Sequence, residues 1–226
     1  VINGNKMFIT NGSVADFMVT ACITNPEEKK HNSFSLIIVP MTTPGITRNK
    51  IKGKLGIRAS DTAEIALEDV RVPQANLIGK EGRGFIQLMH FFDTTRVMVA
   101  AQGLGLSEAC LETSVKYCKE RTAFGQPIGN YQLSQKKLTE MAIQIEALRG
   151  LVYKSAWLID QGTPDYTLAA MAKFYSGQTA VFCANAGVEL HGGYGYIDEY
   201  SVQKWYRDAK ILELYEGTKE AEIMTI

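Results

Sequence analysis

The hydrophobic pattern changes its period once along the chain, near residues 79–84, and this change limits the folds that are open to it. Before that point, apolar residues alternate with polar ones over short stretches, and after it they recur every three or four residues. Alternation is typical of strands with one buried face, whereas the longer spacing is typical of amphipathic helices. We therefore predict an α+β chain, with a β domain at residues 1–78 and a helical domain at residues 79–226.

Short strands separated by turns are predicted for the first part of the chain. Asn3 and Gly4 resemble the two-residue turn of a hairpin, and segment 17–24 alternates so regularly that one of its faces should be better buried. No helical pattern lies between the strands, which favours a sandwich or barrel-like arrangement over β-α-β units. The candidate strands are 6–10, 17–24, 34–39 and 64–67.

Three long helices are predicted after the glycine-rich segment 79–84, which we interpret as a domain linker. They cover about 84–119, 130–160 and a stretch ending near 190. Thr163 and Pro164 form the usual start of a helix, an N-cap followed by proline at the first helical position. Long antiparallel helices with short connections favour a four-helix bundle. The second helix has the most regular apolar seam: Leu138, Met141, Ile145, Leu148, Val152, Ala156 and Ile159.

The composition argues against several classes of function. Lysine plus arginine and aspartate plus glutamate both number 24, so no overall charge attracts nucleic acid or an anionic membrane. The four cysteines form no C-x-x-C pair and no cluster with the three histidines, which argues against a zinc site and favours reduced thiols. No apolar run approaches the roughly 20 residues of a membrane-spanning helix. We expect a globular protein without a metal site.

A short polar segment near the C-terminus, residues 215–218, is the first candidate for chemistry. Glu216 is followed by Gly217, and a residue without a Cβ lets the backbone approach a ligand closely. In a closed pocket beside Leu214 and Tyr215, desolvation would raise the pKa of this carboxyl, as suits a base near neutral pH. By itself, the pattern favours a solvated surface glutamate near a helix end.

Six stretches, in their order and spacing over essentially the whole chain, resemble the acyl-CoA dehydrogenase family of flavoproteins. The stretches are 8–12 with Ala15 and Asp16, 56–62 leading to 70–73 and 76–79, 121–125 with Pro127 and Gln132, 192–196, 207–210 and 215–218. The resemblance implies a helical N-terminal domain, a middle β domain and a C-terminal four-helix bundle. On that basis the chain is part of the middle domain plus the bundle. We expect the N-terminal domain and the upstream flavin-binding segment to be missing, in keeping with a start at Val1 rather than at methionine.

The family resemblance implies an oxidoreductase acting on CH–CH bonds, in which FAD takes the β hydride of an acyl-CoA and leaves the 2,3-enoyl-CoA. Glu216 matches the base that takes the α proton, and its backbone N–H, with a flavin ribityl hydroxyl, would bind the thioester carbonyl. Some branches carry the base on the first bundle helix instead. The matching position here is Thr95, which cannot act as that base.

The resemblance also assigns the remaining site residues. Thr10 would lie beside the flavin ring, Arg121 would meet the pyrophosphate of a neighbouring subunit's FAD, and Arg96 would meet the nucleotide end of CoA. The expected substrate contacts are Asp93, Thr95, Arg96 and Tyr215. The expected FAD contacts are Phe8, Ile9, Thr10, Arg121, Phe124, Tyr131, Gln132, Glu189, Gly192, Gly193, Gly217, Thr218 and Glu220.

Two positions depart from the family pattern, and several have a plain structural alternative. Glu189 stands where glutamine is frequent, and His191 where an apolar residue is usual. An acid beside a pyrophosphate is unfavourable unless it meets a ribose hydroxyl. As alternatives, the Gly192-Gly193 pair could end the third helix, and Thr218 could cap the last one.

The partners implied by the resemblance are an acyl-CoA substrate, an electron-transfer flavoprotein and further copies of the chain, as a homodimer or more typically a homotetramer. The implied compartment is a bacterial or archaeal cytoplasm or the mitochondrial matrix, and the implied metabolism is that of fatty acids. An enoyl-CoA reductase, an acyl-CoA oxidase and a non-catalytic flavin-binding scaffold remain alternatives. The acyl group stays open.

Overall fold

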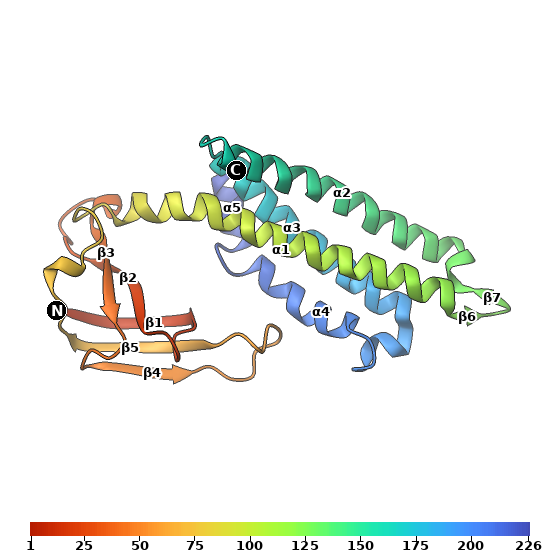
Figure 1. Ribbon diagram of the computed structural model, residues 1–226, viewed down its shortest axis with the longest axis horizontal. Coiled ribbons are helices and arrows are strands. Elements are labelled where there is room, and N and C mark those ends of the chain that lie inside the picture. Colours follow the sequence, from red (N-terminus) through yellow and green to blue (C-terminus); the bar gives the residue numbers. More distant parts are fainter. The chain divides into compact units, whose positions relative to one another are not determined.

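The computed structural model describes residues 1–29 and 31–226 with their side chains. The chain forms two compact units, Val1–Phe91 and Phe92–Ile226, and each is described by itself. The first is built from strands and the second from helices, which confirms the predicted α+β class (Figure 1). Among the described helices, none combines the length and apolar character that a membrane crossing requires.

The β unit contains two small antiparallel sheets. Strand β5 (Thr62–Val70) lies between β1 (Ile2–Thr10) and β4 (Ile46–Lys50), and β2 (Phe17–Ile23) pairs with β3 (Phe34–Pro40). The unit has its own apolar core, because alternate residues of these strands turn inward. The buried members of that core are Ile2, Met18, Val39, Met41, Ile65, Leu67 and Val70.

Two details of the β unit differ from the sequence-based expectation. Asn3 and Gly4 do not turn a hairpin: β1 runs through them, and a register shift against β5 between Ile2 and Gly4 marks a bulge. Gly4 has a positive φ, which both a hairpin turn and a β-bulge accept, so the Asn3-Gly4 pair is compatible with both. Strand β4 was not predicted, because four of its five residues are exposed and its sequence carries no apolar alternation.

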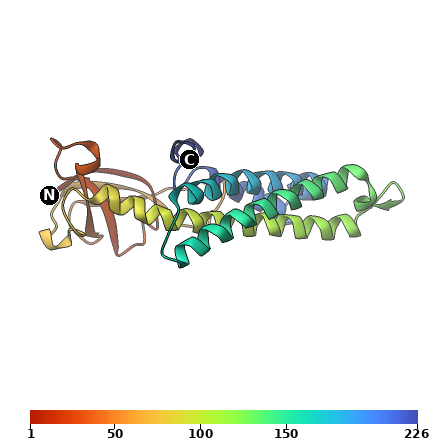
Figure 2. The ribbon, with the colours of Figure 1, turned by 90° about the horizontal axis from the view of Figure 1, so that it is seen from above.

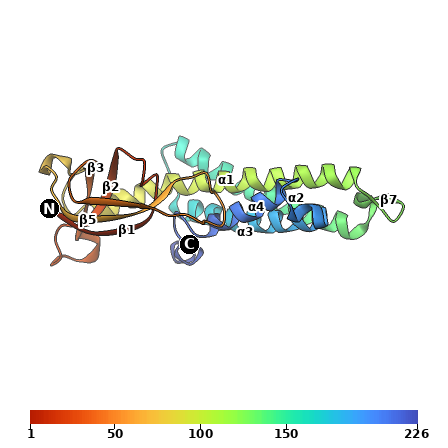
Figure 3. The same cartoon turned by 90° about the horizontal axis from the view of Figure 1, so that it is seen from below.

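The helical unit is built from three long helices: the part of α1 (Gly84–Glu120) beyond residue 91, α2 (Gln132–Asp160) and α3 (Tyr166–His191). Figures 2 and 3 show them running alongside one another, seen from above and from below. Helix α3 is central, since it packs against α2, the short helices α4 (Val202–Ala209) and α5 (Lys219–Thr225), and the 3-10 turns beside them. The predicted α2 seam is confirmed for Met141, Ile145, Leu148 and Val152, all buried in the core.

The connections complete the helical unit. The short strands β6 (Thr122–Ala123) and β7 (Gln126–Pro127) form a hairpin after α1, and the 3-10 turns η3 (Ile128–Asn130), η4 (Gly192–Tyr196) and η5 (Lys210–Glu213) join the helices. The β unit has two more such turns, η1 (Lys30–Asn32) and η2 (Gln74–Asn76).

The start of α3 differs from the prediction by two residues. Asp165, not Thr163, is the N-cap, and its carboxylate accepts a hydrogen bond of 3.0 Å from the backbone N–H of Leu168. Aspartate and threonine are both good N-caps, and the sequence pattern does not separate two such candidates this close together.

Candidate active site

Glu216 lies in a turn between η5 and α5 and is half-buried within the helical unit. Its φ of 54° and the φ of 99° at Gly217 place two consecutive residues in the left-handed region, which is unusual for a residue with a side chain. Thr95 of α1 donates a hydrogen bond of 2.9 Å from Oγ1 to Glu216 Oε2. The structure thus brings together two of the predicted site residues that lie far apart in sequence.

Tyr215, the residue before Glu216, anchors the turn to the bundle. Its ring packs against the helical core, and its hydroxyl donates a hydrogen bond to Gln102 Oε1. Burial, and to a smaller extent the nearby Glu216 carboxylate, raise the pKa of Tyr215. The hydroxyl therefore stays protonated and keeps its role as a donor. Asp93 lies two residues before Thr95 on α1 and is partly buried.

Three charged side chains are buried beneath the same turn. Arg96 Nε lies 3.2 Å from Glu222 Oε2, at ion-pair distance but without hydrogen-bond geometry, and Lys173 Nζ donates to the carbonyl oxygen of Gly217. Arg96 therefore has a partner inside the unit, and its contact with CoA stays a prediction. The sequence did not lead us to predict a role for Lys173 or Glu222. A signal was present for Lys173, because it is the only charged residue between Asp165 and Glu189.

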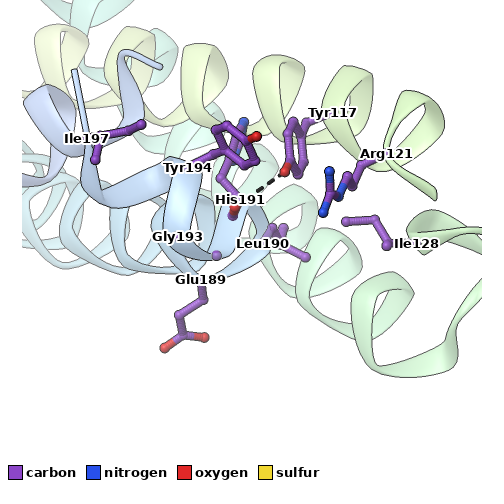
Figure 4. A pocket seen from close by; sticks show the side chains of 10 residues that line it. Tyr117, Arg121, Ile128, Glu189, Leu190, His191, Gly193, Tyr194 and Ile197 are labelled. Carbon is purple, nitrogen blue, oxygen red and sulfur yellow. Dashed lines mark hydrogen bonds between the residues drawn. The ribbon is translucent and has the colours of Figure 1, made fainter. Parts of the chain in front are cut away.

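A cavity of about 520 Å³ lies where the end of α3 meets the end of α1 (Figure 4). Gly192 caps α3 with a φ of 59°, which confirms that this glycine ends the helix. A Cβ added at Gly192 or Gly193 would meet no atom within 4 Å, so the backbone here is open to a ligand. The residues that line the cavity are Tyr117, Arg121, Ile128, Glu189, Leu190, His191, Gly192, Gly193, Tyr194 and Ile197.

Glu189 and His191, the two departures from the family pattern, both have partners within the helical unit. Glu189 forms an ion pair with Lys137 and accepts a hydrogen bond from Asn185, and these contacts hold its pKa below the ordinary value. His191 is buried and stacks on Tyr117 with ring centroids 4.2 Å apart. Its Nδ1 lies 2.7 Å from the Gly187 carbonyl oxygen, and burial lowers its pKa. His191 is thus a neutral histidine of the core.

The β6–β7 hairpin presents an aromatic side chain to solvent. Phe124 is 98% exposed and has a φ of 50°, while the Tyr131 hydroxyl lies 2.8 Å from the Ala123 carbonyl oxygen and 3.2 Å from that of Phe124. Beside it, Gln132 begins α2. These residues border a second cavity, of about 700 Å³. The hydrogen bonds from Tyr131 hold the turn that leaves the Phe124 ring in solvent.

The remaining predicted FAD residues lie at two other places. Thr218 caps α5 by accepting a hydrogen bond of 3.4 Å from the Ala221 N–H, which confirms the capping alternative, and Glu220 is exposed in the first turn of α5. Phe8, Ile9 and Thr10 end strand β1 in the β unit. Phe8 is 72% exposed with a φ of 59°, beside a second register shift of β1.

Comparison with known proteins places this geometry in a family. Residues 82–226 match the model described as acyl-CoA dehydrogenase, C-terminal domain, and residues 1–70 match the middle domain of the same family. A probable acyl-CoA dehydrogenase of Bacillus subtilis is 43% identical over the whole chain, which covers 60% of that relative. An acryloyl-CoA reductase (NADH) of Anaerotignum propionicum is 44% identical, again over the whole chain, which covers 57% of that protein.

Solved structures agree with these sequence matches. The butyryl-CoA dehydrogenase of Megasphaera elsdenii superposes with a TM-score of 0.94 at 42% identity, over 99% of this chain and 58% of that one. The chain thus spans somewhat more than half the length of the relatives it matches. On the strength of both domain matches and of this identity over its whole length, the chain belongs to the acyl-CoA dehydrogenase family.

Proposed function

We propose that the protein is an FAD-dependent acyl-CoA dehydrogenase in which Glu216 takes the α proton of an acyl-CoA thioester. The observation that carries the proposal is the Glu216 carboxylate itself, which is held in a left-handed turn and accepts a 2.9 Å hydrogen bond from Thr95. A base must be fixed in place to act on a weakly acidic carbon, and this contact fixes one of its oxygens. Bound FAD supplies the acceptor for the β hydrogen.

Thr95 has a supporting part in this proposal. Its hydroxyl donates to Oε2 of Glu216 and leaves Oε1 as the oxygen that can receive the proton. The Glu216 N–H is the proposed donor to the thioester carbonyl, where negative charge develops as the α proton leaves. Asp93, two residues before Thr95, and Tyr215, directly before Glu216, are the proposed walls of the acyl site.

The residues around the first cavity fit the pyrophosphate end of FAD. The backbone at Gly192 and Gly193 is open, and Arg121 supplies a cation, with its guanidinium 5.7 Å from the Tyr194 ring centroid. Lys137 neutralises Glu189, which removes the repulsion that an acid would otherwise exert on a phosphate. We propose that these residues and Phe124 hold FAD, with Thr10 and its neighbours in β1 meeting the flavin.

The proposed assembly and electron acceptor follow from the same family. A homo-oligomer, as a dimer or a tetramer, would let Arg121 and Phe124 reach the FAD of a neighbouring subunit. An electron-transfer flavoprotein is the proposed acceptor. In support, one matching structure is described as an electron transferring flavoprotein of Acidaminococcus fermentans and shares 41% identity with this chain.

The reductive direction is a second candidate, favoured by the 44% identity to an acryloyl-CoA reductase. By microscopic reversibility, the Glu216 that takes a proton in one direction returns it to the same carbon in the other. The site residues are therefore common to both candidates.

The visible spectrum of the purified holoenzyme, recorded anaerobically, tests the proposal. We expect oxidised-flavin absorbance that bleaches on addition of one class among short-chain, branched, cyclic and dicarboxylic acyl-CoA thioesters. A flavin that no thioester bleaches, but whose reduced form is reoxidised by an enoyl-CoA, would favour the reductase. Absence of flavin would contradict both candidates.

A further inference from the structure

Three charged side chains from three helices meet beneath the Glu216–Gly217 turn, and we refer to Arg96, Lys173 and Glu222 as the buried charge cluster. Arg96 comes from α1, Lys173 from α3 and Glu222 from α5. The exposed fractions of their side chains are 9%, 1% and 0%. Charged groups are seldom buried this completely unless they are paired or serve a site.

The three members of the cluster make different contacts. Glu222 faces both cations, with Oε2 3.2 Å from Arg96 Nε and Oε1 3.9 Å from Lys173 Nζ. Lys173 also donates a hydrogen bond to the Gly217 carbonyl oxygen. Arg96 and Glu222 already balance each other in charge, so the ammonium of Lys173 is not needed to neutralise Glu222.

The position of Gly217 shows how closely the cluster fits the turn. A Cβ at this residue would lie 2.4 Å from Glu222 Oε1, and its φ of 99° favours glycine. The neighbouring Glu216 keeps an unfavourable left-handed φ, which persists only where the surroundings enforce it. The hydrogen bond from Lys173 holds the Gly217 carbonyl and thereby fixes the peptide group that follows Gly217.

Burial disfavours the charged form of Lys173, and the nearby Glu222 carboxylate favours it. Desolvation and, less strongly, the Arg96 cation lower the pKa of the Lys173 ammonium, while the carboxylates of Glu222, Glu216 and Glu213 act in the other direction. An apolar side chain would fill this site in α3 without that penalty. The lysine is therefore better explained by the carbonyl that it binds than by packing.

We propose that Lys173 is a positioning residue for Glu216: by holding the Gly217 carbonyl, it fixes the turn that presents the carboxylate to Thr95 and to the substrate. The proposal rests on the proposed function of Glu216 as the base. Lys173 itself does not touch the reacting atoms.

The test replaces Lys173 by methionine, which has a similar length and no donor. Because Arg96 and Glu222 remain as a neutral pair, no unpaired charge is left in the core. The readout is exchange of the substrate's α protons with deuterated solvent, followed by NMR on the holoenzyme, since it reports proton removal separately from hydride transfer. We expect Lys173→Met to keep its flavin spectrum and its thioester KM while exchange and kcat fall at least about tenfold.

Three comparisons make the outcome decisive. Lys173→Arg keeps a cation and donors and should recover part of the lost rate, and Lys154→Met, at an exposed position of α2, should behave as the wild type. Wild-type exchange in Lys173→Met, or loss of flavin in both Lys173 variants, would overturn the positioning role. Glu216→Gln separates the two proposals, because normal exchange in that variant would instead contradict the function proposed for Glu216.

Discussion

At the scale of single residues, the unusual feature is a glutamate that keeps a left-handed backbone conformation while its carboxylate is held by a threonine on another helix. The Thr95 position carries no base, but its hydroxyl still serves the carboxylate. A carboxylate held through one oxygen presents its other oxygen for proton transfer. In the function we propose, the chemistry of the turn depends on contacts from α1 and α3 as well as on Glu216.

Replacing Thr95 by valine tests this dependence, because valine has nearly the same shape and cannot donate. We expect kcat to fall roughly ten- to a hundredfold, with KM and flavin content unchanged, since the hydrogen bond to a charged acceptor is worth roughly 1.5–3 kcal/mol. Thr95→Ser keeps the hydroxyl and should retain most of the activity. Steady-state kinetics of the two variants would contradict the account if both were equally active.

At the scale of elements, close helix contacts set the geometry of the bundle. A Cβ at Gly103 of α1 would lie 2.9 Å from Ser176 Cβ of α3, which explains a glycine at this crossing, whereas the space around Gly105 is open. The sequence alone has two glycines at adjacent odd positions of one helix, a pattern that fits a helix crossing or a bend. The sequence does not show which of the two glycines makes the contact, because it does not show which face of α1 packs against α3.

The two glycines of α1 offer a matched pair of variants. Gly103→Ala should destabilise the fold by about 1–3 kcal/mol through overpacking against Ser176. Gly105→Ala should stabilise it by about 0.5–1 kcal/mol, since alanine is the better helix former. Urea unfolding gives both free energies, and an equal effect of the two substitutions would show that the crossing does not depend on Gly103.

The stacked Tyr117 and His191 join the ends of α1 and α3, and they give the bundle a pH dependence. Burial lowers the pKa of His191 in the folded protein, so the unfolded chain binds this proton more readily. The contribution of His191 is complete above its ordinary pKa of about 6.5 and is lost as the pH falls below that value. We expect the melting temperature to drop between pH 7 and 5, and His191→Phe to reduce the drop. An equal reduction in the control His90→Phe, at an exposed position, would argue against this origin.

At the scale of the whole molecule, the chain pairs a β unit with a helical unit, and both match one family. The helix spans and the α2 seam were predictable because apolar spacing records burial along a single element. The cluster of Arg96, Lys173 and Glu222 was not, since three helices remote in sequence supply it. Strand β4 lacked any apolar signal, and the domain boundary after residue 78 stays a prediction.

Substitution of Phe124 tests whether the helical unit completes its proposed FAD site with another molecule. The side chain is 98% exposed at the hairpin tip, so Phe124→Ala should leave the melting temperature of the apoprotein unchanged within about 1 °C. We expect FAD affinity to fall about tenfold, measured by flavin fluorescence during titration. Phe91→Ala, at another exposed aromatic position, is the control. Unchanged affinity in Phe124→Ala would remove this residue from the proposed cofactor site.

The most direct test of the account is a single turnover of Glu216→Gln, followed anaerobically by flavin absorbance in a stopped-flow instrument. Glutamine keeps the size of the side chain and the hydrogen bond from Thr95, but it cannot take a proton. We predict that the variant binds FAD and the thioester that bleaches the wild type, and that flavin reduction slows by at least about a thousandfold. Reduction at the wild-type rate would contradict the assignment of Glu216 as the base.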